Sequence, residues 1–248
     1  MVRGFIFLLF PFLLFAQQSL PYNVGEALEY NVTFKGINVG SATLTVEKSI
    51  DTSNKEIYQI TGKGKTAPFF DIFFRVRDVY KTFLDAQEVR PIRFIRDIYE
   101  GGFEKKQKYN FFHQEGIVRV MDTSYKITPN TQDMLSALFY ARTFSTDSLK
   151  KGKIFEIPIF MDEENFMLET TYLGTELLDT KFGKIPCLVF KPKMQAGRVF
   201  EDGERMKIWI SDDKNKILFK VVTEIWAGDI VAEVSQFKKL KYRLKKLK

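Results

Sequence analysis

The side chains that could perform metal or nucleophilic chemistry are few and scattered. His113 is the only histidine and Cys187 the only cysteine among the 248 residues. A zinc or copper site needs several nitrogen or sulfur ligands, and a Ser-His-Asp hydrolase would have to use His113, which no nucleophile motif accompanies. Cys187 lies in an apolar run at 185–190, which indicates a buried thiol. The sequence therefore predicts no cofactor and no metal, and it favours a protein that is not an enzyme.

The acidic clusters indicate turns instead of catalytic pairs. Three consecutive acids at 162–164 separate two apolar segments, and such acids are usually solvated, whereas a glycosidase holds two carboxylates across a cleft. The acids at 212–213 are expected to accept hydrogen bonds from the backbone of a tight turn. An enzyme would instead require buried carboxylates that converge, such as Asp78 and Glu233.

An apolar segment at 67–75 is a candidate interaction surface. Five of the six residues at 69–74 are large and apolar, which is too dense for the alternation of a half-buried strand. The segment would form a buried crossover, a short helix, or a mobile lip that contacts a lipid or a membrane. Arg75 at its end, with Arg77 and Asp78 beside it, would pair internally or hold an anionic head group. The candidate ligand-binding residues are Phe69, Phe70, Phe73, Phe74, Arg75 and Arg77.

The C-terminal segment carries the excess positive charge. Residues 238–248 contain seven basic and no acidic residues, and the rest of the chain is balanced, which disfavours a nucleic-acid-binding domain. The segment would extend the last strand, form a basic amphipathic helix that binds an anionic membrane surface, or remain a solvated end. The candidate membrane-surface residues are Lys239, Lys241, Arg243 and Lys245.

The N-terminus has the pattern of a secretory signal peptide. Arg3 precedes an apolar run at 5–15 that is too short to span a bilayer, and Ala16 follows it. We expect cleavage after Ala16, which makes residues 1–16 the signal peptide. No cysteine follows the run to accept a lipid, so the protein is predicted not to be a lipoprotein. It is expected in the periplasm of a Gram-negative-type bacterium, where it could lie peripheral to a membrane.

Composition favours one domain. The chain is 45% hydrophobic with 25 phenylalanines, and no linker rich in Ser, Gly or Pro divides it. We expect a single β-barrel-like domain at 17–240 and a basic C-terminal tail at 241–248. Because a lone cysteine has no intramolecular partner in an oxidising compartment, the fold is expected to rest on packing.

Hydrophobic periodicity predicts a mainly β protein. Apolar and polar residues alternate on both sides of a turn at 36–40, which indicates a β-hairpin. One helix is expected at about 131–146, with Asn130 or Thr131 as its cap. The remaining expected strands are at 58–60, 76–84, 92–99, 103–112, 117–121, 154–160, 166–173, 186–191, 205–211, 217–226 and 230–240.

About a dozen sequential strands imply a curved antiparallel sheet. A flat sheet of that width would leave long exposed edges, so we expect a closed or half-open barrel with the helix packed on it or plugging it. Such a barrel either holds a hydrophobic ligand or is filled by its own side chains.

Several short motifs are spread along the chain: Gly25-Glu26-x-Leu28-x-Tyr30, the turn from Gly36 to Gly40, and the segments 133–142, 209–213 and 228–233. Together they resemble those of one family of exported bacterial proteins, the DUF3108 family. The likeness extends from about residue 22 to residue 239 and implies a β-rich protein of the periplasm or outer membrane without supplying an activity. The family's fold is similar in shape to the open barrels of carriers that ferry lipoproteins across the periplasm.

Three functions remain open from the sequence. The first is a non-enzymatic binding or carrier protein for a lipid or other apolar ligand, which an apolar cavity would favour. The second is a structural or accessory cell-envelope protein that has a filled barrel and acts through contacts with other envelope proteins. The third is an unrecognised enzyme. Nucleic acid is not an expected partner of any of them.

Overall fold

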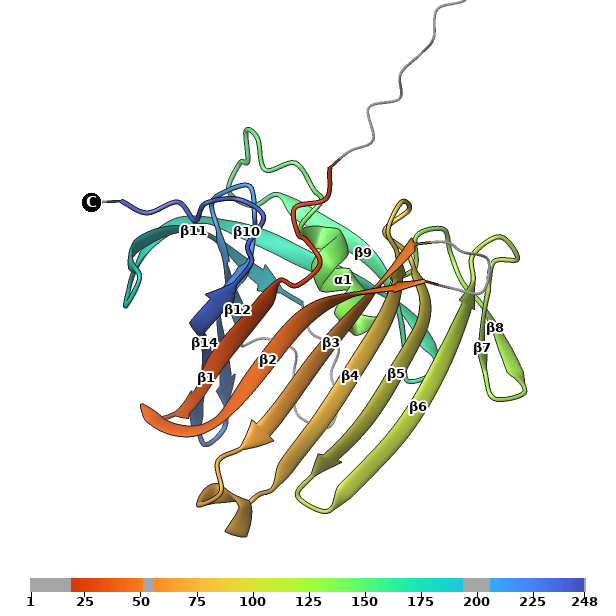
Figure 1. Ribbon diagram of the computed structural model, residues 1–248, viewed down its shortest axis with the longest axis horizontal. Coiled ribbons are helices and arrows are strands. Elements are labelled where there is room, and N and C mark those ends of the chain that lie inside the picture. Colours follow the sequence, from red (N-terminus) through yellow and green to blue (C-terminus); the bar gives the residue numbers. More distant parts are fainter. Residues whose placement is uncertain (1–18, 51–55, 194–205, 248) are drawn as a thin grey trace, which may run out of the picture.

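The computed structural model describes residues 19–50, 56–193 and 206–247 (Figure 1). The predicted signal peptide at 1–16 lies outside the described residues. Within them, no helix is both long and apolar enough to cross a bilayer.

The described chain is mainly β, as the periodicity predicted. The exposed four-residue strand β8 was missed because it has no apolar alternation, and β10 extends beyond the 166–173 expected for it. The fourteen strands assigned are β1 (Ala27–Phe34), β2 (Ile37–Ile50), β3 (Glu56–Thr66), β4 (Val76–Asp85), β5 (Pro91–Glu100), β6 (Phe103–Phe112), β7 (Ile117–Val120), β8 (Thr123–Lys126), β9 (Ile154–Met161), β10 (Glu164–Thr180), β11 (Gly183–Pro192), β12 (Met206–Ser211), β13 (Leu218–Ile225) and β14 (Gly228–Lys238).

All the strands belong to one antiparallel sheet, and the predicted β1–β2 hairpin is confirmed. The order is β8-β7-β6-β5-β4-β3-β2-β1-β14-β13-β12-β11-β10-β9, so β8 and β9 are the edges and the barrel is not closed by hydrogen bonds. Register shifts in β1, β10 and β12 let the sheet coil strongly, as Figure 1 shows.

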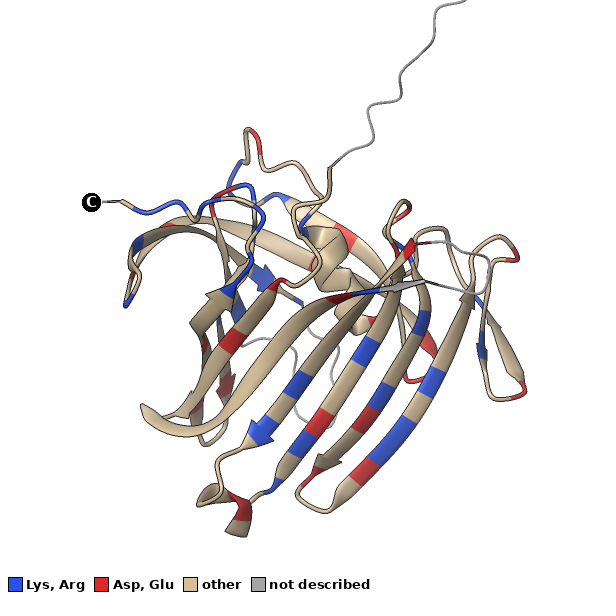
Figure 2. Cartoon of the chain, viewed as in Figure 1, with Lys and Arg blue, Asp and Glu red and all other residues tan. Residues whose placement is uncertain are grey.

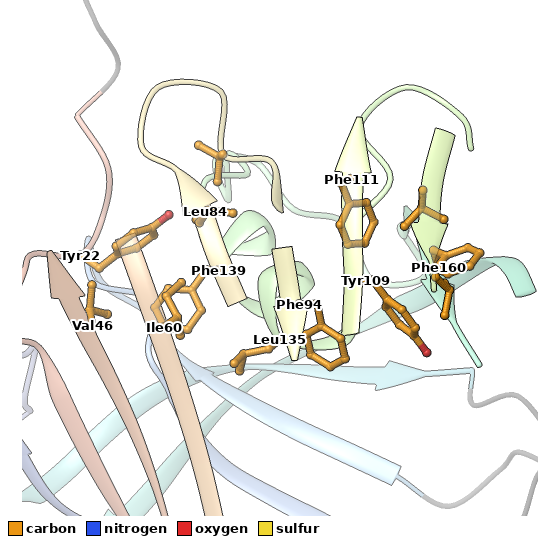
Figure 3. Close-up of a cluster of buried hydrophobic side chains, with 13 residues drawn as sticks. Tyr22, Val46, Ile60, Leu84, Phe94, Tyr109, Phe111, Leu135, Phe139 and Phe160 are labelled. Atoms are coloured by element: carbon orange, nitrogen blue, oxygen red, sulfur yellow. The ribbon is translucent and has the colours of Figure 1, made fainter. Parts of the chain in front are cut away.

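No ladder of backbone hydrogen bonds pairs the edge strands β8 and β9, and side chains connect this part of the sheet instead. Phe160 of β9 is fully buried, and its ring lies 5.2 Å from that of Tyr109 on β6 and 5.5 Å from that of Tyr125 on β8. The backbone N–H of Asp162 donates to the Tyr109 hydroxyl at 3.1 Å. The β9–β10 hairpin thus covers the open edge through aromatic packing (Figure 3).

The helix α1 (Met134–Ala141) is shorter than expected, and the predicted cap at Asn130 or Thr131 is wrong. Asp133 caps it, accepting hydrogen bonds from the backbone N–H groups of Leu135 and Ser136 at 2.8 Å. The helix starts late because Gln132 pairs with the edge of β9, where its N–H donates to the Pro158 carbonyl at 2.8 Å. It ends at Arg142, which is held by the contacts described below.

Two apolar clusters form most of the core. The first gathers side chains of β2–β7, β9 and α1 around Phe139, whose ring lies 5.0 Å from that of Tyr22 (Figure 3). The second lies between β1 and β11–β14 and contains Tyr30, Trp209 and Cys187. Cys187 is fully buried, as its apolar run predicted, and burial raises the pKa of its thiol to about 12.

A buried ion pair ties α1 to the start of β1. The Arg142 guanidinium contacts both carboxylate oxygens of Glu26, at 2.6 and 3.0 Å, and the two side chains are 3% and 1% exposed. Arg142 also donates to the Asn215 carbonyl at 2.9 Å, next to the β12–β13 turn. The family-like motifs around Glu26, Arg142 and Asp213 therefore meet at one junction.

The C-terminal tail packs on this junction. After β14 the chain forms neither the amphipathic helix nor the longer strand considered from its sequence. The Tyr242 N–H donates to the Asn215 side chain at 2.8 Å, the Lys245 N–H donates to Asp213 at 3.0 Å, and Leu244 is buried in the second cluster. Asp213 also accepts from the N–H of Asn215 at 2.9 Å, which confirms its expected role in the turn.

Candidate functional site: an apolar cavity

The barrel encloses a cavity of about 1010 Å³ between α1, strands β4–β6 and strands β9–β13. This is at the upper end of the range of roughly 300–1,000 Å³ that is usual for small-molecule sites. Twenty-one of its 31 lining residues are apolar, so an occupant would gain mainly by burying hydrocarbon. The apolar lining includes Leu138, Phe144, Ile157, Phe166, Leu168, Leu188, Phe190, Ile208, Ile210 and Leu218.

The cavity runs from α1 toward the opposite end of the sheet. Met134, Leu138 and Phe144 cover it at the helix side, whereas Glu100 and Phe103 line it beside the β5–β6 turn. We call the end formed by the turns β1–β2, β3–β4, β5–β6 and β13–β14 the hairpin end, and these turns lie along the lower edge in Figure 1.

A charged cluster lines the cavity toward the hairpin end. Arg96 of β5 donates to Gln107 and is ion-paired with Asp162, which Lys105 also contacts at 2.5 Å. Burial disfavours the charged form of Asp162, but the hydrogen bond from Lys105 and the charge of Arg96 outweigh it and lower its pKa. The acids at 162–164 are exposed at the β9–β10 turn, as expected, but Asp162 also pairs with cations that come from strands far away in the sequence.

Arg96 retains one hydrogen-bond donor. Its side chain is buried, and its Nε has no acceptor within the part of the chain that the structure describes. Because this nitrogen has almost no accessible surface, a molecule in the cavity would reach it only after a shift of the side chain. Other atoms of Arg96 line the cavity, so its charge marks the polar end of the cavity.

The other cations of the cavity are engaged by the protein. Arg142 is paired with Glu26, and the Lys216 ammonium donates to the Phe144 carbonyl. Burial lowers the pKa of Lys216. These contacts hold the segment after α1 in place. The cations at the helix side of the cavity therefore stabilise the fold, and an occupant would meet mainly apolar side chains there.

Asp78 lies near the hairpin end with an unusual ionisation. Burial, and then the charge of Glu100 on the neighbouring strand, raise its pKa to about 6, although the Tyr99 N–H donates to it at 3.2 Å. Glu233, the other acid considered for catalysis, is on β14 and pairs with Lys220 at 3.4 Å. Strands β1–β3 separate these two acids in the sheet, so they do not converge.

The Asp78→Asn variant should be more stable than the wild type at pH 8 but not at pH 4. A raised folded-state pKa means that protonated Asp78 stabilises the protein below pH 4, and that this contribution is lost as the pH rises through 6. Asparagine removes the titration and still accepts from Tyr99, so the difference at pH 8 should be about 2 kcal/mol. Urea unfolding at both pH values measures it, and an equal difference at both would contradict the assignment.

The predicted ligand-binding residues do not line the cavity. Five of the six occupy the β3–β4 turn at the hairpin end, where Phe70 begins the short 3₁₀ helix η1 (Phe70–Ile72), and Arg77 is the second residue of β4. Arg77 pairs with Asp71, and Arg75 lies over the Tyr99 ring at 5.8 Å, so both arginines make internal contacts. The turn is a short helix, as one alternative had it, but it is not buried: the exposed side chains are those of Phe69, Ile72, Phe73 and Phe74.

The predicted membrane-surface residues lie far from that turn, on the tail (Figure 2). Lys239, Arg243 and Lys245 are exposed, and Lys245 pairs with Asp212 at 2.8 Å. Lys241 donates to the Leu20 carbonyl at 2.6 Å. The lysines of the tail therefore help to hold it against the body.

The only histidine and the acidic residues give no metal site. His113 stacks on Phe111, its Nε2 lies 2.9 Å from the Pro91 carbonyl oxygen, and burial lowers its pKa. Among residues 19–50, 56–193 and 206–247, no three His, Cys, Asp or Glu side chains come together as metal ligands.

Solved structures share this architecture. One is the crystal structure of a beta-barrel-like protein of the domain of unknown function DUF1849 from Brucella abortus, with a TM-score of 0.59 and 10% sequence identity. The match covers 89% of this chain and 99% of that protein. At this identity the likeness extends to the fold alone.

The sequence comparisons identify the family but no activity. No curated protein shows significant similarity to the chain. The family model described as "Protein of unknown function (DUF3108)" matches residues 29–235 and thus includes most of the barrel. The resemblance noted from the short motifs is confirmed, and the chain belongs to the DUF3108 family.

Proposed function

We propose that the protein is an exported, non-enzymatic binding or carrier protein for a molecule with a long apolar chain and a polar head. The observation that carries this proposal is the cavity of about 1010 Å³ with its apolar lining. An accessory protein with a filled barrel would have packed side chains in that volume. The N-terminal pattern supports export to the periplasm, where an apolar molecule needs a carrier to cross water.

The charges support one orientation of the occupant. Arg96 and Lys105 line the cavity toward the hairpin end together with Glu100, Asp162 and Glu164, whereas the lining near α1 is mostly apolar. A polar head would therefore lie beside Arg96 and Lys105, and the chain would extend toward Leu188 and Ile208. Hydrogen bonds with this charged lining would favour a lipid with a polar head over a neutral oil.

Filling the cavity should strongly weaken the binding of an apolar ligand. We expect the fluorescent fatty acid 11-(dansylamino)undecanoic acid to bind the mature protein in a 1:1 ratio. Leu168→Trp places a large ring in the cavity and should weaken that binding at least tenfold. The matched control is Met167→Trp, because Met167 directly precedes Leu168 in β10, does not line the cavity and has an exposed side chain.

Fluorescence titration with unfolding as a second readout measures both variants. The proposal is supported when only Leu168→Trp loses affinity while both variants keep the wild-type melting temperature within a few degrees. Equal binding by wild type and Leu168→Trp would place the probe outside the cavity and overturn the proposal.

A further inference from the structure

We propose that the hairpin end docks on a lipid bilayer, with apolar side chains from three turns entering the interfacial layer. Trp226 in the β13–β14 turn is 94% exposed. In the β3–β4 turn Phe69, Ile72 and Phe73 are 68%, 81% and 74% exposed, and Ile37 after the β1–β2 turn is also exposed. Large apolar side chains gathered at one end of a protein mark an interaction site.

The strand register brings these turns to the same end. Phe34 at the end of β1 pairs with Ile37 on one side and with Ile230 on the other, so the β1–β2 and β13–β14 turns are neighbours. The Ala67 N–H donates to the Val39 carbonyl at 2.8 Å, which places the β3–β4 turn beside them. The apolar residues form one set although up to 189 positions separate them in the sequence.

The β3–β4 turn is held in shape by polar contacts and not by burial. Asp71 accepts hydrogen bonds from the Thr66 hydroxyl and from Arg77, the latter at 3.0 Å, and the Val76 N–H donates to the same hydroxyl at 3.0 Å. Hydrogen bonds from Arg77 and then Thr66 lower the pKa of Asp71. The turn therefore presents its phenylalanines to solvent in a fixed arrangement.

A glycine supports the same turn from β5–β6. Gly101 has φ +56°, and a Cβ at this position would lie 2.2 Å from the ring of Phe74. The ring of Phe74 thus rests on the backbone of the next hairpin, which only glycine permits. The two turns are joined without burying the outer phenylalanines.

Exposed cations lie beside the apolar set. Lys35 is two residues before Ile37, and Lys65 lies in β3 just before the turn that carries Phe69. Figure 2 shows acidic and basic residues interspersed on the lower halves of β4–β6. Exposed aromatic residues with lysines behind them are typical of proteins that bind at the interfacial layer of a membrane.

A bilayer fits this surface better than a protein partner. The side chains project from separate hairpin turns, and a fluid lipid layer can surround each turn, whereas a protein partner would need a matching recess for each. The cavity also reaches the hairpin end at Phe103, so docking would bring its polar end to the membrane. The inference does not depend on what the cavity holds.

Vesicle binding tests the surface directly. The mature protein should sediment with vesicles of phosphatidylglycerol and phosphatidylcholine, and the triple variant Phe69→Ser, Ile72→Ser, Phe73→Ser should bind at least tenfold more weakly. The control variant Ile154→Ser, Leu177→Ser removes exposed apolar side chains elsewhere and should bind as the wild type does. All variants should retain the wild-type far-UV spectrum and affinity for the dansyl fatty acid.

The fluorescence of Trp226 gives a second readout, which does not depend on a difference in binding between variants. The other tryptophan, Trp209, is buried and donates to Glu176 at 2.7 Å, so a blue shift of emission on adding vesicles would report Trp226 entering lipid. The shift should disappear in Trp226→Phe. Equal loss of sedimentation by the control variant, undiminished binding by the triple variant, or bound protein without a blue shift would overturn the proposal.

Discussion

Replacing Arg142 by alanine should lower the free energy of unfolding by about 3–5 kcal/mol, because it leaves the Glu26 carboxylate buried without its partner. The guanidinium also packs over the rings of Tyr22 and Phe139, at 5.1 and 5.2 Å, so packing is lost as well. Urea unfolding at pH 7 measures the loss. The expected result would mean that the ion pair between Arg142 and Glu26 holds α1 in position over the cavity.

Two further variants test whether the loss of stability comes from a charge left unpaired in the interior or from the removal of any ion pair. Lys106→Ala removes the partner of Asp97 in an exposed pair and should cost less than about 1 kcal/mol. The double variant Glu26→Leu, Arg142→Met should lose less than Arg142→Ala alone, because no charge is left buried. A loss below 1 kcal/mol in Arg142→Ala would contradict this account of the junction.

Phe160→Ala should lower the free energy of unfolding by about 3–5 kcal/mol, because the removed ring is fully buried and leaves a void. The ring also joins edge strand β9 to β6 and β8, where no hydrogen-bond ladder does so. The variant should therefore show faster exchange of the amide hydrogens in β9 and the adjacent residues of β10, besides its lower stability.

The control for this position is Phe112→Ala on β6. Phe112 is only partly buried and packs against Arg119, at 4.9 Å from its guanidinium, and it lies outside the core cluster. We expect it to cost less than half as much as Phe160→Ala, with no change in exchange at β9. Equal effects would mean that the edge is held by other contacts.

The sequence predicted the sheet well and its closure only in part. Alternation identifies a strand such as β1 because Leu28 and Tyr30 are buried on one face, but β8 is largely exposed and gives no pattern. The helix was overextended at its start because Gln132 pairs with β9 in the fold, and at its end because the chain leaves the helix at Arg142. Local spacing does not report such competition from a distant strand.

The site could not be found from the sequence because its parts are far apart. Arg96 and Asp162 meet across 66 positions, and Glu26 and Arg142 across 116. The segment at 67–75 was conspicuous because its apolar residues are consecutive, yet it forms a turn outside the cavity. The cavity lining comes from every second residue of neighbouring strands such as β9–β12, a pattern that looks in sequence like that of any core.

The central claim is that the cavity holds the apolar chain, and photolabelling tests it most directly. A fatty acid with a diazirine at the end of its chain would be bound to the mature protein, irradiated and mapped by peptide mass spectrometry. We predict labels on lining residues of α1 and β9–β12, such as Leu138, Ile157 and Ile208, and their loss in Leu168→Trp. Labels confined to the hairpin end, at residues such as Phe69 and Trp226, would contradict the claim.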